Sequence, residues 1–364
     1  LPILLPSPPK QSSIIYPIFA NSTEANPVNI STIRQFASTG LDTCPDIDRF
    51  YTWLILLGIC PNTYSKWQSQ LNELIMQYND YVNFTNLNDW NNLYIPPNVT
   101  IDDFSNNREL GMIHLDIVRS GRLFYFLPPR PIVNGKKLID RNNDEADDIL
   151  FEFQEHLRRL ERVLFIFQTL HSGMGYMQGF NELAIIFYYV LLKPYLGINK
   201  TLTKDDLDTI ECLTFHCFQK LMTDTQLPEF YTTQDESSII MHKLKSFNAL
   251  IAVHLPTTHE IISSLGIHPI FYCLRWFTLL FAQEHDLPSL LMIWDSIFAH
   301  FKYMTDYLFY VGLGHLKMIE NKLDRNQYST TIEILQHMKL SGKVKPVLTF
   351  AKECWEKDKR PDCK

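Results

Sequence analysis

Apolar side chains recur along most of this chain at the three- and four-residue spacing of a helix face. In residues 149–170, for example, Phe153, Leu157, Leu160 and Leu164 follow one another at this spacing. The alternating apolar and polar runs that are typical of strands are rare. The pattern therefore predicts an all-α fold.

Start and stop residues sharpen the limits of several predicted helices. Residues 45–58 begin at Pro45 and end at Gly58, as helices often do. The predicted helices cover 45–58, 64–81, 108–119, 149–170, 180–195, 205–223, 235–253, 256–265, 268–284, 288–301, 304–320, 328–339 and 343–357. An Asn-rich stretch at 83–107 and an acidic one within 127–148 are predicted loops.

The ends of the chain differ in composition from its middle. Residues 1–29 are rich in Pro, Ser and Asn and predict an extended tail that docks at most locally. Residues 30–325 form the main predicted domain, and 326–364 a helical extension. A linker between two lobes is expected near 196–204.

Composition excludes some classes of protein. With 46% hydrophobic and 13% aromatic residues, the 364-residue chain can fill a large core. A net charge of -7 argues against a broad nucleic-acid-binding surface. One local basic cluster, Arg158, Arg159 and Arg162, lies on a predicted helix face, where we expect it to be solvated.

No pattern indicates a cofactor, a metal or a membrane span. The seven scattered cysteines contain no C-x-x-C pair, and the spacing of Cys212, His216 and Cys217 suits an apolar helix better than a metal site. The apolar stretch 183–192 is about half of the ~20 residues that a span needs. We therefore expect a cytoplasmic protein that reaches endomembranes, if at all, peripherally through partners.

Two short strings carry candidate chemistry. Residues 113–119 read I-x-x-D-x-x-R and end at Arg119, and residues 176–179 read Y-x-Q-G and contain Gln178. An arginine supplies a permanent planar charge for the developing charge on a γ-phosphate, and a glutamine can orient the attacking water. Together they could complete the active site of a GTPase.

Each string also has an ordinary interpretation. Arg119 could be a surface arginine paired with Asp116, three residues earlier on the same helix. Gly173, Gly175 and Gly179 allow unusual backbone geometry around Gln178, but their spacing does not fit a P-loop or dinucleotide motif. Catalysis of its own on a small substrate has no support.

The order of several blocks resembles the TBC domain family, whose members are mainly GTPase-activating proteins for Rab-type GTPases. Residues 160–164 precede Y-x-Q-G-F-N-E at 176–182, which is similar to the family's Y-x-Q-G-M-N-E. The other matching positions are Arg49, Trp53, Leu56 and Gly58, then Arg275, Trp276, Leu280, Phe281 and Glu284, and finally Trp294 and Asp295. Within the family, the chain most resembles the subgroup of human TBC domain family member thirteen.

The resemblance implies an all-helical, two-lobed fold, with lobes of about 30–198 and 199–325. It implies that Arg119 and Gln178 are the two catalytic fingers, with Gln178 acting in place of the GTPase's own glutamine. Supporting roles would fall to Asp116, Tyr176, Gly179 and Asn181, the last as a cap or pin for the glutamine loop. The implied partner is a Rab GTPase that itself carries GTP and Mg²⁺. Arg49, Trp53, Arg275, Trp276, Trp294 and Asp295 would hold the fold.

One departure from the family pattern lies next to the finger itself. The family often reads Arg-Thr-x-Pro at the finger, whereas Ser120, Gly121 and Arg122 follow Arg119 here. Arg122 is also a rival arginine three residues on. Two alternatives therefore stay open: a catalytically weak TBC-fold module that binds a GTPase or scaffold partner, and a helical scaffold unrelated to GTPases.

Overall fold

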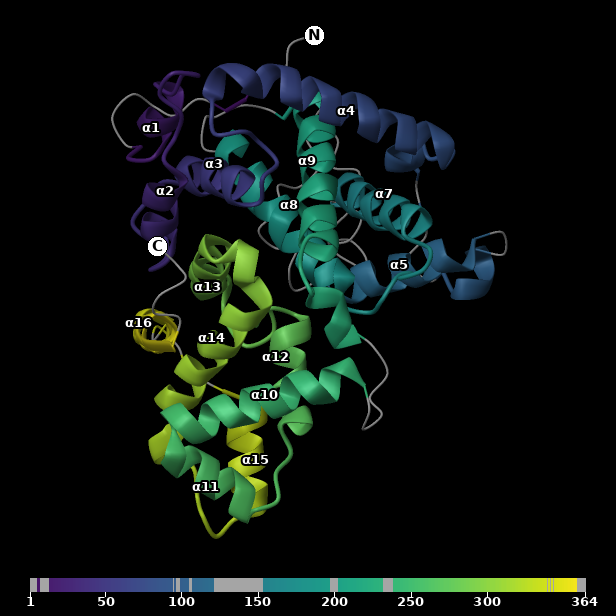
Figure 1. Ribbon diagram of the computed structural model, residues 1–364. Coiled ribbons are helices and arrows are strands. Elements are labelled where there is room, and N and C mark those ends of the chain that lie inside the picture. The colour runs from purple at the N-terminus through teal and green to yellow at the C-terminus, as the bar shows by residue number, and fades with distance from the viewer. Residues whose placement is uncertain are drawn as a thin grey trace, which may run out of the picture. The chain divides into compact units, whose positions relative to one another are not determined.

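The computed structural model describes most of the chain in atomic detail (Figure 1). The described residues are 5–6, 13–93, 95, 99–104, 107–120, 153–196, 202–231, 238–338, 340, 342 and 344–358. The predicted acidic loop within 127–148 and most of the predicted linker lie outside them. Within these ranges the regular elements are all helical, which confirms the predicted all-α fold.

Most predicted helices are present with small changes at their ends. The described α-helices are α1 Tyr16–Ala20, α2 Ile30–Ala37, α3 Asp46–Leu56, α4 Trp67–Phe84, α5 Arg108–Arg119, α7 Gln154–Leu170, α8 Phe180–Leu196, α9 Lys204–Thr223, α10 Ile239–His254, α11 Pro256–Ser264, α12 Leu274–Thr278, α13 Leu287–Ala299, α14 Met304–Ile319, α15 Tyr328–Gln336 and α16 Val344–Asp358. The predicted loop at 83–107 contains two short 3₁₀ helices, η2 Trp90–Asn92 and η3 Ile101–Phe104.

Two segments differ from their predictions. The predicted extended tail contains α1, because the buried Asp48 carboxylate accepts the backbone N–H groups of Ile14 and Tyr16, each at 3.0 Å, and so fixes the start of that helix. The range 268–284, which was predicted to be a single helix, instead holds a 3₁₀ helix, η6 Pro269–Phe271, and the short α12, which ends at Thr278. Leu280 and Phe281 have φ values of 47° and 64°, in the left-handed region that a right-handed helix cannot contain.

The chain divides into two compact units. One comprises the described residues of Leu1–Pro6 and Trp67–Gln219, and the other those of Ser7–Lys66 and Lys220–Lys364. The boundaries of these two units differ from those of the two predicted lobes. The lobes therefore stay a prediction. In the first unit, α7 contacts α4, α5 and α8, and α5 also contacts α8 (Figure 1).

Asp295 organises the core of the second unit. Its carboxylate accepts hydrogen bonds from Arg49, the shortest of 2.9 Å from Nε and 3.0 Å from Nη2, and one of 2.8 Å from Trp53 Nε1. Trp53 stacks on Trp294, and Trp294 Nε1 donates to the Leu280 carbonyl at 2.9 Å. Because all of these side chains are buried, their predicted structural role is confirmed.

Arg275 serves the same unit from a half-exposed position. Its Nε donates to Glu284 Oε1 at 2.8 Å and its Nη2 to the Gln336 carbonyl at 2.6 Å. The C-terminal helix α16 packs against α14, where a Cβ at Gly314 would collide with the backbone of Val347. The described residues after 325 are thus part of the same packed unit. Among the described residues no helix combines the length and apolar character that crossing a membrane requires.

Candidate functional site

Helix α5 presents Arg119 to solvent. Its apolar stripe of Leu110, Ile113 and Ile117 is buried, which leaves the Arg119 side chain 71% exposed at the last helical position. Asn107 caps the start of the helix, because its side chain accepts the backbone N–H of Leu110 at 3.3 Å. Arg119 Nη1 lies 3.3 Å from Asp116 Oδ1, so the predicted pair forms but remains at the surface.

Gln178 lies on the turn between α7 and α8. Its side chain is exposed, whereas Phe180, two residues later, is fully buried. Gly175 and Gly179 have φ values of 71° and 104°, which a residue with a Cβ adopts only with strain. The Tyr176 and Phe180 rings meet edge to face with centroids 5.9 Å apart. The glycines therefore shape the turn, and the two aromatic rings brace it.

Hydrogen bonds join this turn to the end of α5. The Tyr176 hydroxyl donates to Asp116 Oδ2 at 3.1 Å, so Asp116 contacts Tyr176 through one oxygen and Arg119 through the other. Asn181 Oδ1 accepts the Gly179 N–H at 3.1 Å, and Asn181 Nδ2 donates to the Asp116 carbonyl at 3.1 Å. The structure thus links Asp116, Tyr176, Gly179 and Asn181 by hydrogen bonds. Arg119 joins this network through Asp116, and Gln178 directly precedes Gly179 in the chain.

Ser120 is a member of this network that the sequence analysis did not assign a role. Its hydroxyl donates to the Asp116 carbonyl at 3.0 Å and accepts a 2.6 Å bond from Asn181 Nδ2. The side chain is buried although it directly follows the exposed Arg119. A serine at a helix end is common, so nothing in the sequence alone distinguishes this one. Gly121 and the rival Arg122 lie outside the described residues.

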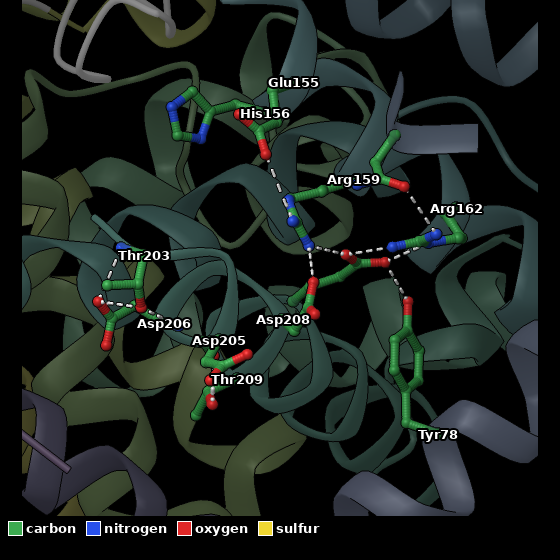
Figure 2. Close-up of polar contacts among 12 residues, drawn as sticks. Tyr78, Glu155, His156, Arg159, Arg162, Thr203, Asp205, Asp206, Asp208 and Thr209 are labelled. Carbon is green, nitrogen blue, oxygen red and sulfur yellow. Dashed lines mark hydrogen bonds and ion pairs between the residues drawn. The ribbon is translucent and has the colours of Figure 1, made fainter. Parts of the chain in front are cut away.

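The basic cluster on α7 is buried, and the expectation that it is solvated was wrong. Arg162 makes a two-point contact with Glu211 on α9, at 2.6 Å from Nε to Oε1 and 2.8 Å from Nη2 to Oε2. Arg159 Nη1 donates to Glu211 at 2.6 Å and to Asp208 at 2.7 Å, and the Tyr78 hydroxyl donates to Glu211 at 2.7 Å. Figure 2 shows Arg159, Arg162 and Tyr78 converging on this point.

The charges of this cluster balance one another. Burial raises the pKa of Glu211, but the hydrogen bonds and charge of Arg162, with the charge of Arg159, outweigh it and hold that pKa below its ordinary value. The third arginine, Arg158, pairs with Glu161 on its own helix, and Glu161 Oε1 lies 2.8 Å from His114 Nδ1 on α5. These contacts fasten α5 and α9 to α7, so their role is structural.

The cysteine and histidine group on α9 shows no sign of metal-binding chemistry. Cys212 and Cys217 are buried, and burial raises the pKa of both thiols, which disfavours the thiolate that a metal needs. His216 Nε2 lies 3.2 Å from the Leu74 carbonyl. Across the described ranges no three His, Cys, Asp or Glu residues are grouped as metal ligands.

The arrangement of helices and motifs agrees with comparisons to known proteins. The model of the Rab-GTPase-TBC domain matches residues 139–323, about half of the chain, and this range includes the Gln178 turn. The chain therefore belongs to the Rab-GTPase-TBC domain family. Arg119 lies before the matched range, so its assignment depends on its own motif and on the contacts described above.

Relatives and solved structures extend this comparison. The chain is 33% identical over 174 residues to TBC domain-containing protein C1952.17c of Schizosaccharomyces pombe, which covers 47% of this chain and 26% of that protein. It is 28% identical over 200 residues to human TBC1 domain family member 13, which covers 55% of this chain and 48% of that protein. The chain therefore spans about half or less of the length of these relatives.

Two solved structures share the fold. The crystal structure of the Ypt/Rab-GAP domain of Gyp1p matches with a TM-score of 0.70 and 18% identity, covering 95% of this chain and 99% of that one. The TBC domain of the Chlamydomonas flagellar RabGAP matches with a TM-score of 0.55 and 14% identity, covering 90% and 86%. At these identities the comparison establishes the helical architecture.

Proposed function

We propose that this protein is a GTPase-activating protein for a Rab-type small GTPase. It binds the GTPase in its GTP- and Mg²⁺-loaded form and supplies Arg119 and Gln178 to the nucleotide. The observation that carries this proposal is the network of Asp116, Tyr176 and Asn181, which ties an exposed arginine to the turn that bears an exposed glutamine.

The chemistry follows from what each side chain can do. The transition state of phosphoryl transfer spreads negative charge over the γ-phosphoryl oxygens, and a guanidinium that enters the site can contact two of them at once. An arginine finger increases the rate by about 10³–10⁵-fold. The amide of Gln178 has one acceptor and two donors, so it can orient the attacking water while it contacts a backbone group.

Asp116 and Tyr176 prepare the arginine for this task. Asp116 is only 12% exposed, and its second oxygen accepts the Tyr176 hydroxyl. The carboxylate is therefore held in place and limits the positions that Arg119 samples before docking. On this proposal the protein acts on membrane-bound Rab from the cytoplasm and so regulates vesicle trafficking, with recruitment through partners.

The test is single-turnover GTP hydrolysis by a panel of purified Rab GTPases. Wild type, Arg119→Ala and Gln178→Ala are compared with Arg34→Ala and Gln35→Ala, two exposed residues of α2 that match the chemistry of the fingers. We expect one or a few Rabs to respond to the wild type and to both α2 variants, but to neither finger variant.

Two other results would overturn the proposal in different ways. A Rab that binds in a GTP-dependent manner without faster hydrolysis would identify a catalytically weak TBC-fold module. A panel in which no Rab binds or responds would point to a helical scaffold that is unrelated to GTPases. Full activation by Arg119→Ala would contradict only the assignment of Arg119 as a catalytic finger.

A further inference from the structure

Asn181 is only 4% exposed, and its carboxamide lies between two finger segments. These are the end of α5, which bears Arg119, and the turn between α7 and α8, which bears Gln178. Its Nδ2 group has two N–H donors, and these reach the Asp116 carbonyl at 3.1 Å and the Ser120 hydroxyl at 2.6 Å. Its oxygen accepts the Gly179 N–H at 3.1 Å and lies 3.4 Å from the Tyr176 hydroxyl. Every donor and acceptor direction of this amide is therefore directed at one finger segment or the other.

The contacts fall next to the fingers in the chain. Ser120 directly follows Arg119, and Gly179 directly follows Gln178. The Ser120 hydroxyl is used in both directions, since it donates to the Asp116 carbonyl and accepts from Asn181. Ser120 is 7% exposed, so water does not readily replace these bonds.

We infer that Ser120 and Asn181 are positioning residues that fix the spacing between the arginine and glutamine fingers, so that the two enter a GTPase as one unit. This inference rests on the proposed function. The chain departs from the family pattern at residue 120, where serine replaces threonine. The serine hydroxyl forms two hydrogen bonds there, so the end of α5 is still anchored.

The residue types at these positions are constrained by their hydrogen bonds. An aspartate at 181 has nearly the shape of asparagine but no N–H, so it would face the Asp116 carbonyl and Ser120 with acceptors only. It would also add a negative charge near the Asp116 carboxylate. An alanine at 120 would remove one partner of Nδ2, whereas a threonine would keep the hydroxyl.

Activity assays on a responsive Rab give the first test. Because a displacement of about 1 Å can cost about 10²-fold in rate, we expect Asn181→Asp to lower kcat by about 100-fold. The loss of both hydrogen bonds of the Ser120 hydroxyl in Ser120→Ala should lower kcat by about tenfold. Ser120→Thr keeps the hydroxyl and should restore kcat to within about twofold of wild type. KM for the Rab should stay the same, since buried residues do not contact the partner.

A double-variant comparison separates positioning from general stability. If Ser120 acts through its hydrogen bond to Asn181, adding Ser120→Ala to a protein that already carries Asn181→Asp should change the remaining rate by less than about twofold. If the serine only stabilises the fold, its effect should instead multiply with that of Asn181→Asp and appear as a lower melting temperature.

Hydrogen–deuterium exchange gives a test that needs no GTPase. We expect Asn181→Asp to speed exchange in peptides that cover 113–120 and 174–181 together, with peptides from α7 unchanged. Unchanged exchange in both peptides, or full kcat in both Asn181→Asp and Ser120→Ala, would overturn the inference. A wild type that activates no Rab would overturn the proposed function instead, and the exchange result would still decide whether the two segments are coupled.

Discussion

Arg119 and Arg159 lie in the same compact unit, but their side chains are 71% and 0% exposed. Arg119 has one 3.3 Å contact with Asp116. Arg159 donates at 2.6 Å to Glu211, whose side chain is buried, and at 2.7 Å to Asp208, whose side chain is 42% exposed. An exposed ion pair contributes about 0–1 kcal/mol to stability, whereas breaking a buried one costs about 3–5 kcal/mol. Arg159 thus holds the fold, whereas Arg119 contributes little to it and, in the proposed function, serves a partner.

The comparison is sharpest for a change that keeps the charge of Arg119. Arg119→Lys keeps one positive charge but loses the planar fork, so we expect activation to fall by about 10³-fold and to approach that of Arg119→Ala. The urea unfolding midpoint should not change. Activation within about tenfold of wild type would show that charge alone suffices and that the fork is not used.

For the buried cluster around Arg159 we expect the opposite result, which is a large loss of stability. Glu211→Ala leaves Arg159 and Arg162 without their shared carboxylate, which should lower the free energy of unfolding by about 3–5 kcal/mol. Thermal and urea unfolding measure this loss. Glu73→Ala, an exposed residue of α4, is the matched control and should change stability by less than about 0.5 kcal/mol. An equally small effect of Glu211→Ala would contradict the structural role of the cluster.

Tyr176 combines the two roles compared here, because its ring packs within the turn and its hydroxyl contacts Asp116, which pairs with the exposed Arg119. Tyr176→Phe keeps the ring against Phe180 but removes the hydroxyl that donates to Asp116 at 3.1 Å. We expect single-turnover activation to fall by about tenfold with little change in stability, because the lost bond is to a charged group at a partly exposed position. An unchanged rate would show that Asp116 orients Arg119 unaided.

The smallest expected effect is the pH dependence of stability that comes from buried histidines in the second compact unit. Burial lowers the pKa of His285 from 6.5 to about 4 and that of His315 well below 6.5, and their Nε2 atoms lie 2.7 Å apart. Unfolded histidines bind protons below pH 6.5 while these folded ones do not. The stability that comes from keeping these two histidines neutral in the fold is therefore complete above pH 6.5 and is lost as the pH falls toward 4.

Unfolding in urea at pH 7 and pH 6 checks this effect. The loss should be about 0.5–1 kcal/mol per buried histidine. His300, whose pKa burial also lowers to about 4, shares the same range of pH. His285→Gln should make the dependence shallower, because an amide can still donate to His315 without titrating. An identical slope in this variant would show that His285 binds protons equally in the folded and unfolded protein.

The local pattern predicted what lies on one element, and it failed for features that depend on distant residues. The spacing of Leu110, Ile113 and Ile117 predicted a helix at 108–119, and α5 has these bounds. The solvated role expected for Arg159 and Arg162 was wrong, because Glu211 lies some fifty residues further along the chain and no helical spacing connects it to them. The left-handed backbone at Leu280 and Phe281 had no sequence signal, since neither residue is a glycine.

The same division applies to the site. The two strings, with the family resemblance, singled out Arg119, Gln178 and their supporting residues. The structure joins those supporting residues to the segments that bear Arg119 and Gln178. Ser120 was missed because its contribution depends on the direction of one hydroxyl toward Asn181, sixty-one positions away. Motifs name the groups that carry chemistry, whereas the groups that hold them are found from contacts.

The measurement that tests the central claim most directly uses one responsive Rab in two forms, with its own catalytic glutamine and with leucine in its place. Single-turnover GTP hydrolysis is followed with wild-type protein and with Gln178→Ala. If Gln178 and Arg119 complete the active site in trans, the wild type accelerates both forms of the Rab and Gln178→Ala accelerates neither. Acceleration that requires the Rab's own glutamine and survives Gln178→Ala would contradict the account.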